Sequence, residues 1–206
     1  MTPRKLAVVS AGLSQPSSTR LLADRLAQAA TRSLQEQGAD SGTDVIELRD
    51  HAHDLANNLL TGFPSGDLRG ALDGVVEADG LIAVTPIFTA SYSGLFKTFF
   101  DVLEPESLAG KPVLIAATGG TARHSLALEH AVRPMFSYLR SVVVPTAVYA
   151  ASEDWGSGDG GGGALTDRID RAAAELAALV TDRASIVPKD PFDDPTPFED
   201  LLAGPR

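Results

Sequence analysis

Cysteine is absent from this chain of 206 residues. Its absence excludes disulfide bonds, thiolate nucleophiles and zinc sites built from cysteine. Long apolar runs are also missing, and none approaches the roughly 18 residues that a transmembrane helix needs. The first residues lead directly into an apolar segment, so we expect no signal peptide and a cytoplasmic location.

Positive charge is scarce as well. Lysine and arginine together number 17 against 27 acidic residues, which gives a formal net charge of −10. Nucleic acids and anionic membranes are therefore unfavourable partners, because both are bound through basic patches. The chain is apolar enough for one folded core. We expect a single domain over residues 1–187, followed by a tail rich in proline and aspartate over residues 188–206.

Short apolar runs alternate with amphipathic segments along the chain. The expected strands are Leu6–Ser10, Asp44–Leu48, Gly80–Val84, Pro112–Ala117 and Val142–Ala150. Apolar runs without alternation are typical of strands that are buried on both faces. Strands that alternate with helices predict an α/β fold. We therefore expect a flavodoxin-like, doubly wound sheet of five parallel strands in the order 2-1-3-4-5.

The helices between these strands are predicted from apolar residues that recur every three or four positions. They are a helix that ends near Gly38, then Asp67–Ala78, Ser93–Leu103, His124–Leu139 with a kink at Pro134, and a last helix carrying Leu165 to Leu179. Pro86 is expected to end the third strand, and Gly156–Gly163 to form a mobile loop.

Three aromatic residues give the helix Ser93–Leu103 an unusually wide apolar face. Phe96, Phe99 and Phe100 extend further around it than contact with one sheet requires. A large apolar surface usually marks an interface. This helix therefore predicts a homodimer or a homotetramer.

Hydroxyl side chains crowd the segment that follows the first expected strand. They belong to Ser10, Ser14, Ser17, Ser18 and Thr19. A helix that begins there presents free N–H groups and a positive dipole to an anion. One such serine could simply be an N-cap, but so many hydroxyls favour a phosphate site. The segment lacks both the dinucleotide and the P-loop fingerprints, so it suits one terminal phosphate, as in FMN. We expect Arg20 to reach that phosphate.

Two further loops follow expected strands at the same edge of the sheet. After the third strand, Ile87 and Phe88 could cover the flat isoalloxazine ring of FMN. After the fourth, Thr118, Gly119 and Gly120 allow close approach of the backbone to the polar edge of that ring. An ordinary turn at the two glycines is the alternative. Arg123 either reaches the flavin or the phosphate of NADPH, or is solvated.

The segment His51-Ala-His53-Asp54 invites a metal site, but its spacing does not match a metallohydrolase pattern. A solvated loop or the start of a helix is the simpler interpretation, and we predict no metal.

The segments Ala90–Asp101, Leu108–Val113 and Ala117–Thr121 together resemble the NAD(P)H-dependent FMN reductase family. Within it, the chain is similar to reductases that supply reduced FMN to luciferase-like or alkanesulfonate-type monooxygenases. The resemblance implies that the phosphate is bound by Ser10, Ser17, Ser18 and Thr19, the ring by Pro86, Ile87, Phe88 and Thr89, and the pyrimidine edge by Thr118, Gly119 and Gly120. His130 departs from the tyrosine usual in alkanesulfonate-type members.

This resemblance implies an enzyme that transfers a hydride from NADPH or NADH to FMN, with a flavin-dependent monooxygenase as a possible partner. The alternatives are a quinone, azo or metal-ion reductase with FMN as a prosthetic group, and a flavodoxin-type electron carrier. A structural protein without flavin is the third.

Overall fold

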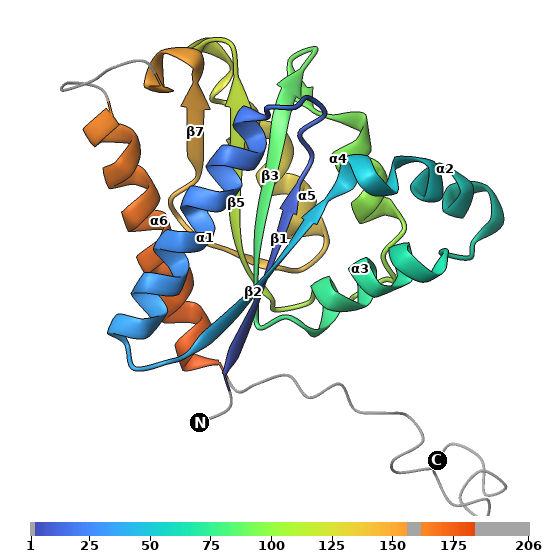
Figure 1. Ribbon diagram of the computed structural model, residues 1–206, viewed down its shortest axis with the longest axis horizontal. Coiled ribbons are helices and arrows are strands. Elements are labelled where there is room, and N and C mark those ends of the chain that lie inside the picture. The colour runs from blue at the N-terminus through green and yellow to red at the C-terminus, as the bar shows by residue number, and fades with distance from the viewer. Residues whose placement is uncertain (1–2, 156–161, 184–206) are drawn as a thin grey trace, which may run out of the picture.

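A parallel sheet forms the centre of the molecule. The computed structural model describes residues 3–155 and 162–183, and Figure 1 labels their elements. The strands are β1 (Arg4–Ser10), β2 (Ser41–Glu47), β3 (Gly80–Phe88), β4 (Ser91–Tyr92), β5 (Pro112–Gly119), β6 (Val142–Val143) and β7 (Val148–Ala151). Their order is β2-β1-β3-β5-β6, with β4 paired to β3 and β7 paired to β5. The predicted order 2-1-3-4-5 is confirmed, because β4 is only a short antiparallel addition.

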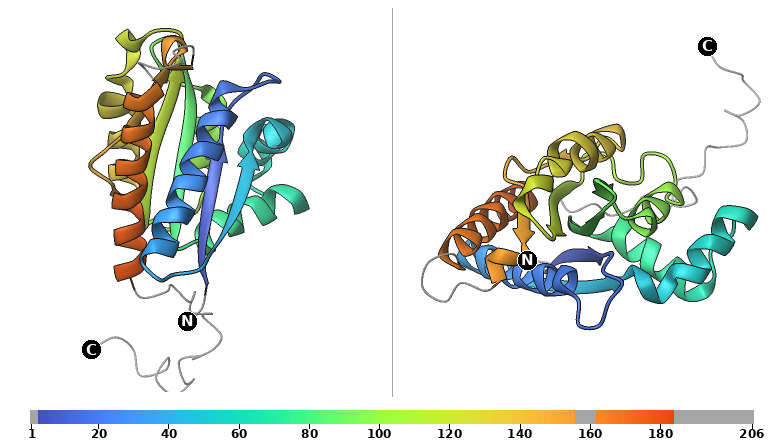
Figure 2. Two further views of the ribbon diagram at one scale, coloured as in Figure 1. Left: turned by 60° about the vertical axis from the view of Figure 1, so that its left-hand side comes forward. Right: turned by 90° about the horizontal axis from the view of Figure 1, so that it is seen from above.

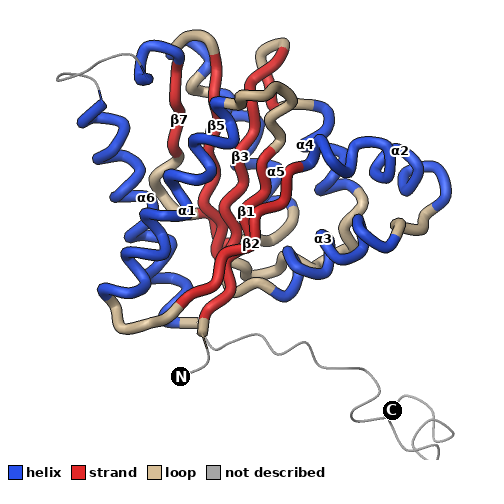
Figure 3. Tube along the Cα trace, viewed as in Figure 1, coloured by secondary structure: helices blue, strands red, loops and turns tan. Residues whose placement is uncertain are grey.

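Helices cover both faces of this sheet (Figures 1 and 2). One face is covered by α1 (Ser18–Glu36) and α6 (Gly162–Asp182), which lie side by side. The other carries α2 (Ala52–Thr61), α3 (Gly66–Glu77), α4 (Gly94–Asp101) and α5 (Arg133–Tyr138). Figure 3 shows the strands at the centre of the molecule, with helices on either side of them.

Strand β1 shows why its sequence is apolar throughout. Leu6 and Val8 pack into the core under α1 and α6, whereas Ala7 and Val9 pack into the core on the opposite face. Successive side chains of a strand point to opposite faces, so a strand between two helical layers needs apolar residues at every position.

The third expected strand continues past Pro86, contrary to the prediction. β3 reaches Phe88, and Pro86 lies in register with Thr118 of β5. On its other side β3 has already lost its neighbour, because pairing with β1 ends at Val84. The missing N–H of proline therefore leaves no gap in the hydrogen-bond ladder.

The fifth expected strand is divided in two. β6 and β7 both pair with β5 in parallel, but residues 144–147 between them belong to neither strand. Pro145 lies in this interval, and proline cannot donate to a ladder. The prediction of one continuous strand from Val142 to Ala150 was wrong at this point.

The helix predicted from His124 to Leu139 is also shorter and less regular than expected. A 3-10 turn, η2 (Ala122–His124), comes first, followed by a π-helical turn, η3 (Leu128–Val132), and then α5. Because η3 runs directly into α5, Pro134 lies inside a continuous helical segment, as predicted, and the irregularity takes the form of a π-helical turn just before it. Proline cannot bond to the carbonyl four residues earlier and its ring crowds that carbonyl, which accounts for the wider turn just before it.

The aromatic face of α4 lies inside the protein. Phe96, Phe99 and Phe100 are at most 3% exposed. Phe136 of α5 fills the space against them, with its ring centroid 4.9 Å from that of Phe100. The inference that these phenylalanines form an exposed interface was therefore wrong, because a second helix packs on them within the same chain.

η1 (Leu48–His51) leads into α2, so the segment with the two histidines is the start of a helix. Most of the expected glycine loop and the whole tail over 188–206 lie outside the described residues, although Gly162 and Gly163 belong to α6. In the part of the chain that the structure describes, no helix is long and apolar enough to cross a membrane.

Candidate functional site

A pocket of about 360 Å³ lies where β1, β3 and β5 end, at the carboxyl edge of the sheet. Ligands of open α/β sheets bind at this edge. The pocket is lined by Leu13, Ser14, Ser17, Ser18, Thr19, Pro86, Ile87, Phe88, Thr118, Gly119, Gly120 and Ser152. The fold therefore brings together the three loops selected from the sequence. Of the predicted site residues, Ser10, Thr89 and Arg123 do not line this pocket.

The first loop is shaped by a close contact between Gly12 and Ser17. A Cβ atom on Gly12 would stand 2.1 Å from the Ser17 Oγ, so any other residue there would displace this hydroxyl. That Oγ accepts a hydrogen bond from the backbone N–H of Arg20 at 3.2 Å. Ser17 is thus the N-cap of α1 and at the same time lines the pocket. Ser18, the first residue of α1, is exposed to the pocket side.

Ser10 lies beneath this loop rather than in the pocket wall. Its side chain is fully buried, and its Oγ has no hydrogen-bond partner among the described residues. A buried hydroxyl without a partner is unusual in a folded protein. At the end of β1, the described residues therefore leave one buried polar group, the Ser10 hydroxyl, without a hydrogen bond.

Arg20 does not supply charge to this loop as expected. Its Nε donates to Asp24 at 2.8 Å and its Nη1 to Glu47 at 2.5 Å. The hydrogen bond and charge of Asp24, with a contribution from Glu47, raise the pKa of Arg20, although partial burial opposes them. Within the described residues, the pocket lining contains no lysine or arginine. The first loop therefore offers hydroxyl groups and the N-terminus of α1.

The second loop is a hairpin that brings Phe88 to the pocket. Ile87 pairs with Tyr92, and Phe88 with Ser91. The turn between them holds Thr89 and Ala90 at φ of 49° and 68°. Non-glycine residues rarely adopt this left-handed conformation, but a two-residue hairpin turn requires it. Phe88 remains 47% exposed beside the pocket, and Thr89 is a turn residue that shapes the hairpin.

The third loop joins the end of β5 to η2. Gly119 and Gly120 both line the pocket. Thr121 then accepts a hydrogen bond at its Oγ1 from the backbone N–H of Arg123 at 3.3 Å. The Arg123 residue is exposed and follows this turn. Small residues at the end of β5 leave the backbone N–H groups of the loop open to a ligand.

These donors fit a phosphate-bearing aromatic compound such as FMN. Serine hydroxyls and a helix N-terminus suit one phosphate group. The apolar surfaces of Pro86, Ile87 and Phe88 suit a flat ring, and a glycine loop suits its polar edge. The fold and the pocket together define a flavodoxin-like protein with room for a mononucleotide.

Comparison with known proteins identifies the family. The model of the NADPH-dependent FMN reductase family matches residues 4–156, and the chain belongs to this family. It is 37% identical over 186 residues to an FMN reductase (NADPH) of Pseudomonas aeruginosa, covering 90% of this chain and 97% of the relative. It is 36% identical over 176 residues to the NADH-dependent FMN reductase SfnF of Pseudomonas fluorescens, covering 85% of this chain and 91% of the relative.

Among solved structures, an oxidoreductase from Corynebacterium diphtheriae superimposes with a TM-score of 0.86 at 46% identity, covering 89% of this chain and all of that one. The predicted family, fold class, enzyme class and cofactors, FMN with NADPH or NADH, are confirmed by these findings.

Proposed function

We propose that the protein binds FMN in the pocket at the carboxyl edge and reduces it with NADPH or NADH. The observation that carries this assignment is the meeting of three loops, one rich in hydroxyls, one apolar and one rich in glycine, in a member of an FMN reductase family. FMN supplies the redox chemistry, because its ring accepts a hydride from the reduced nicotinamide. The protein supplies binding, orientation and electrostatics.

The phosphate of FMN is bound by the first loop in this proposal. Ser17 and Ser18 stand at the N-terminus of α1, where free N–H groups favour an anion. Thr19 is held from below by Thr118, since their hydroxyl oxygens are 2.8 Å apart. Ser10 lies beneath the loop, where its buried Oγ has no hydrogen-bond partner among the described residues.

The flavin ring is placed between the second and third loops. Phe88 and Ile87 lie on the hairpin side, with Pro86 at the end of the pairing between β3 and β5. Thr118, Gly119 and Gly120 lie on the side of the pyrimidine edge. Reduction places negative charge on that edge, and the backbone N–H groups of a glycine loop stabilise such charge. The nicotinamide stacks on the ring face that the protein leaves open. The exposed Arg123 lies beyond the pocket lining and would meet a phosphate of the nicotinamide nucleotide.

FMN is proposed to act as a substrate that leaves after reduction. The support is the lining itself, which in the described residues contains hydroxyls and N–H groups but no lysine or arginine. A hydrogen bond contributes about 1 kcal/mol net, so this set need not retain FMN permanently. Released reduced FMN reacts readily with oxygen, so we also propose a flavin-dependent monooxygenase as the partner and a cytoplasmic location.

The purified full-length protein tests both proposals. NADPH and NADH oxidation are measured by nicotinamide absorbance at increasing FMN concentration. The proposal expects a mostly colourless protein whose rate saturates with added FMN. A yellow protein whose rate does not depend on added FMN would make FMN a prosthetic group and favour the quinone or azo reductase alternative. If the protein binds FMN tightly but does not oxidise NADPH or NADH, the electron-carrier alternative is favoured.

We further propose that a second copy of the chain covers a groove between α4 and α5. This groove has a volume of about 510 Å³, and its lining includes Tyr92, Met135 and Tyr138. Tyr138 is 87% exposed. Tyrosine and methionine are enriched at protein–protein interfaces. Light scattering tests the proposal by measuring the molar mass in solution. The wild-type protein should have the mass of a homodimer or homotetramer at micromolar concentration, and a Tyr138→Glu variant should have a lower mass. A monomeric wild-type protein contradicts it.

A further inference from the structure

Tyr149 of β7 lies directly beneath the glycine loop of the pocket. A Cβ atom on Gly119 would stand only 2.0 Å from the Tyr149 Oη and 3.0 Å from its Cζ. The first of these distances is far shorter than any contact of a real Cβ atom, so a side chain at residue 119 would force the Tyr149 phenol to move. We predicted from the sequence that Gly119 allows the close approach of a ligand, and in the structure a side chain of the protein itself also approaches this residue closely.

The hydroxyl of Tyr149 also bonds to this loop. Its Oη donates a hydrogen bond to the backbone carbonyl oxygen of Thr121 at 2.9 Å. Tyr149 is only 8% exposed. Burial, followed by the charge of Asp154, raises the pKa of its phenol. The group therefore stays protonated near neutral pH and remains a donor.

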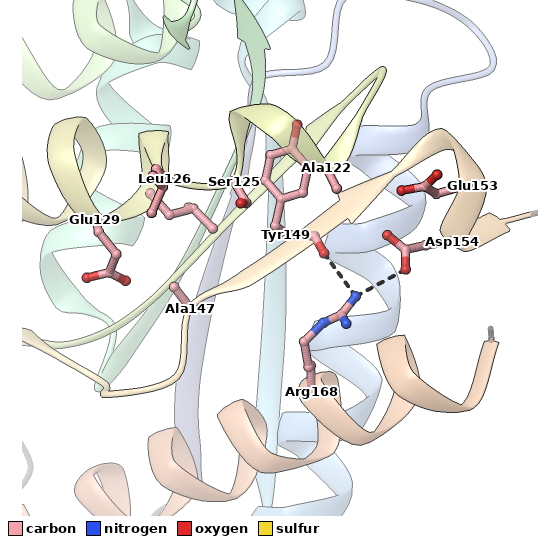
Figure 4. Close-up of a pocket in the computed structure, with 10 residues that line it drawn as sticks. Ala122, Ser125, Leu126, Glu129, Ala147, Tyr149, Glu153, Asp154 and Arg168 are labelled. Atoms are coloured by element: carbon pink, nitrogen blue, oxygen red, sulfur yellow. Dashed lines mark hydrogen bonds and ion pairs between the residues drawn. The ribbon is translucent and has the colours of Figure 1, made fainter.

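Tyr149 is itself held in place from the other side, as Figure 4 shows. The Nη2 of Arg168 donates to the backbone carbonyl of Tyr149 at 3.3 Å and to Asp154 Oδ1 at 3.2 Å. The Oδ2 of Asp154 accepts the backbone N–H of Ala151 at 2.7 Å. This small network fixes the end of β7, and with it the ring that supports the loop.

The loop has few other attachments. Gly119 pairs with Ala151 of β7. For the next two residues, Gly120 and Thr121, the hydrogen bond from Tyr149 is the one that joins them to another strand in the described chain. A Cβ on Gly120 would meet no atom within 4 Å. The conformation of the segment therefore depends strongly on one phenol hydroxyl.

We propose that Tyr149 is a positioning residue for FMN reduction. By holding the Thr121 carbonyl, it orients the N–H groups of the glycine loop toward the pyrimidine edge of the flavin. This inference rests on the proposed placement of FMN. Because negative charge gathers at that edge on reduction, a correctly oriented loop stabilises reduced FMN more than oxidised FMN. A residue that only packs in the core would affect the two redox forms equally.

The test measures the dissociation constants of oxidised and reduced FMN, the latter under anaerobic conditions, for the full-length protein and its Tyr149→Phe variant. The variant keeps the ring and removes the hydroxyl. We expect the ratio of the reduced to the oxidised dissociation constant to rise about fivefold, the equivalent of one lost hydrogen bond. Thr146→Val is the matched control, because it removes a hydroxyl bond of 2.7 Å to Glu175 in the segment just before β7, away from the glycine loop.

A second variant keeps the test decisive if the first is poorly folded. Gly119→Ala displaces the Tyr149 ring, so it should reproduce the change in the ratio, and adding Tyr149→Phe to it should change little more. An unchanged ratio in Tyr149→Phe, additive effects in the double variant, or an equal change in Thr146→Val overturns the inference. If the wild-type protein neither binds FMN nor oxidises NADPH or NADH in its presence, the proposed function fails first, and the inference fails with it.

Discussion

The hydroxyl oxygens of Thr19 and Thr118 lie 2.8 Å apart, although 99 residues separate them in the sequence. Thr19 belongs to the first turn of α1, and Thr118 to the end of β5. Both residues are almost completely buried. This hydrogen bond joins the loop proposed for the phosphate to the loop proposed for the flavin ring, so the two parts of the pocket are fixed relative to each other.

Replacing Thr118 by valine should weaken both folding and FMN binding. Valine has the same shape but no hydroxyl, so Thr19 is left buried without a partner, which costs about 1–3 kcal/mol. We expect the free energy of unfolding, measured by urea denaturation, to fall by that amount. The dissociation constant of FMN should rise several-fold, because the first turn of α1 is no longer held.

The double variant Thr19→Val, Thr118→Val provides the control for this prediction. Removing both partners leaves no unsatisfied group, so the double variant should be closer to the wild type in stability than the sum of the single variants predicts. Thr98→Val removes a hydroxyl bond within α4 and should leave FMN binding unchanged. Strict additivity would show that the two hydroxyls do not support each other.

Introducing negative charge at Ser18 should weaken FMN binding specifically. Two like charges 4 Å apart repel by about 4 kcal/mol at an effective dielectric constant of about 20, and Ser18 is exposed at the pocket. Allowing for screening by solvent, we expect Ser18→Asp to raise the FMN dissociation constant at least about tenfold, or about 1.4 kcal/mol. Fluorescence quenching of FMN measures this directly.

Ser65→Asp is the matched control, since Ser65 is the exposed N-cap of α3 and lies outside the pocket. It changes the net charge equally and should leave the affinity unchanged. An unchanged FMN titration in Ser18→Asp would remove the first loop from the site.

Most of the sheet could be predicted from the sequence, because strands buried on both faces are continuous apolar runs. The meeting of the three loops also followed from general rules, since parallel strands of one sheet end at the same edge. Pro86 and Pro145 illustrate the limit of this reasoning. The same residue type is accepted inside β3 and interrupts the segment between β6 and β7, and the difference depends on which neighbouring strand needs an N–H at that position.

Tertiary contacts explain the remaining errors. The wide aromatic face of α4 was taken for an outer surface because the sequence does not show that Phe136 of α5 packs on it. The role of Tyr149 could not be predicted either. It depends on the register that places Tyr149 opposite Ala117, so that its ring reaches Gly119, and register is a property of the folded sheet.

Stability should rise with pH between about pH 8 and 10.5 because of Lys111. Its Nζ is buried and donates to the backbone carbonyls of Val76 and Ala78. Burial, and secondarily the charge of Arg183, lower its pKa from 10.5 to about 8, although Asp79 opposes them. Below pH 8 the folded and unfolded states both carry the proton, and the folded state bears the full cost of a buried charge. Above pH 8 the folded state releases the proton first, so unfolding takes up a proton and becomes less favourable as pH rises.

The gain is complete above pH 10.5, where both states are neutral, and it amounts to roughly 3 kcal/mol. Urea denaturation at several pH values measures it as a difference between the wild type and Lys111→Met. The variant lacks the titrating group, so its stability should rise less across this interval, whatever its stability at neutral pH. Lys97→Met removes instead a partly exposed lysine that pairs with Asp101, and should retain the wild-type slope. Parallel pH profiles for the wild type and Lys111→Met would contradict the prediction.

Removing the aromatic ring of Phe88 should raise the KM for FMN and leave kcat nearly unchanged. Phe88 is 47% exposed at the tip of the hairpin between β3 and β4, and a bound flavin ring would cover it. Contacts between aromatic rings contribute about 0.5–1.5 kcal/mol beyond the area they bury, so we expect Phe88→Ala to raise KM about three- to tenfold. The side chain takes no part in the hydride transfer and binds the ground state and the transition state alike, which is the condition for a change in KM alone.

Phe63→Ala is the control, because Phe63 is 77% exposed and lies outside the pocket. If both variants change KM equally, or if only kcat falls in Phe88→Ala, the hairpin does not form the wall of the flavin site.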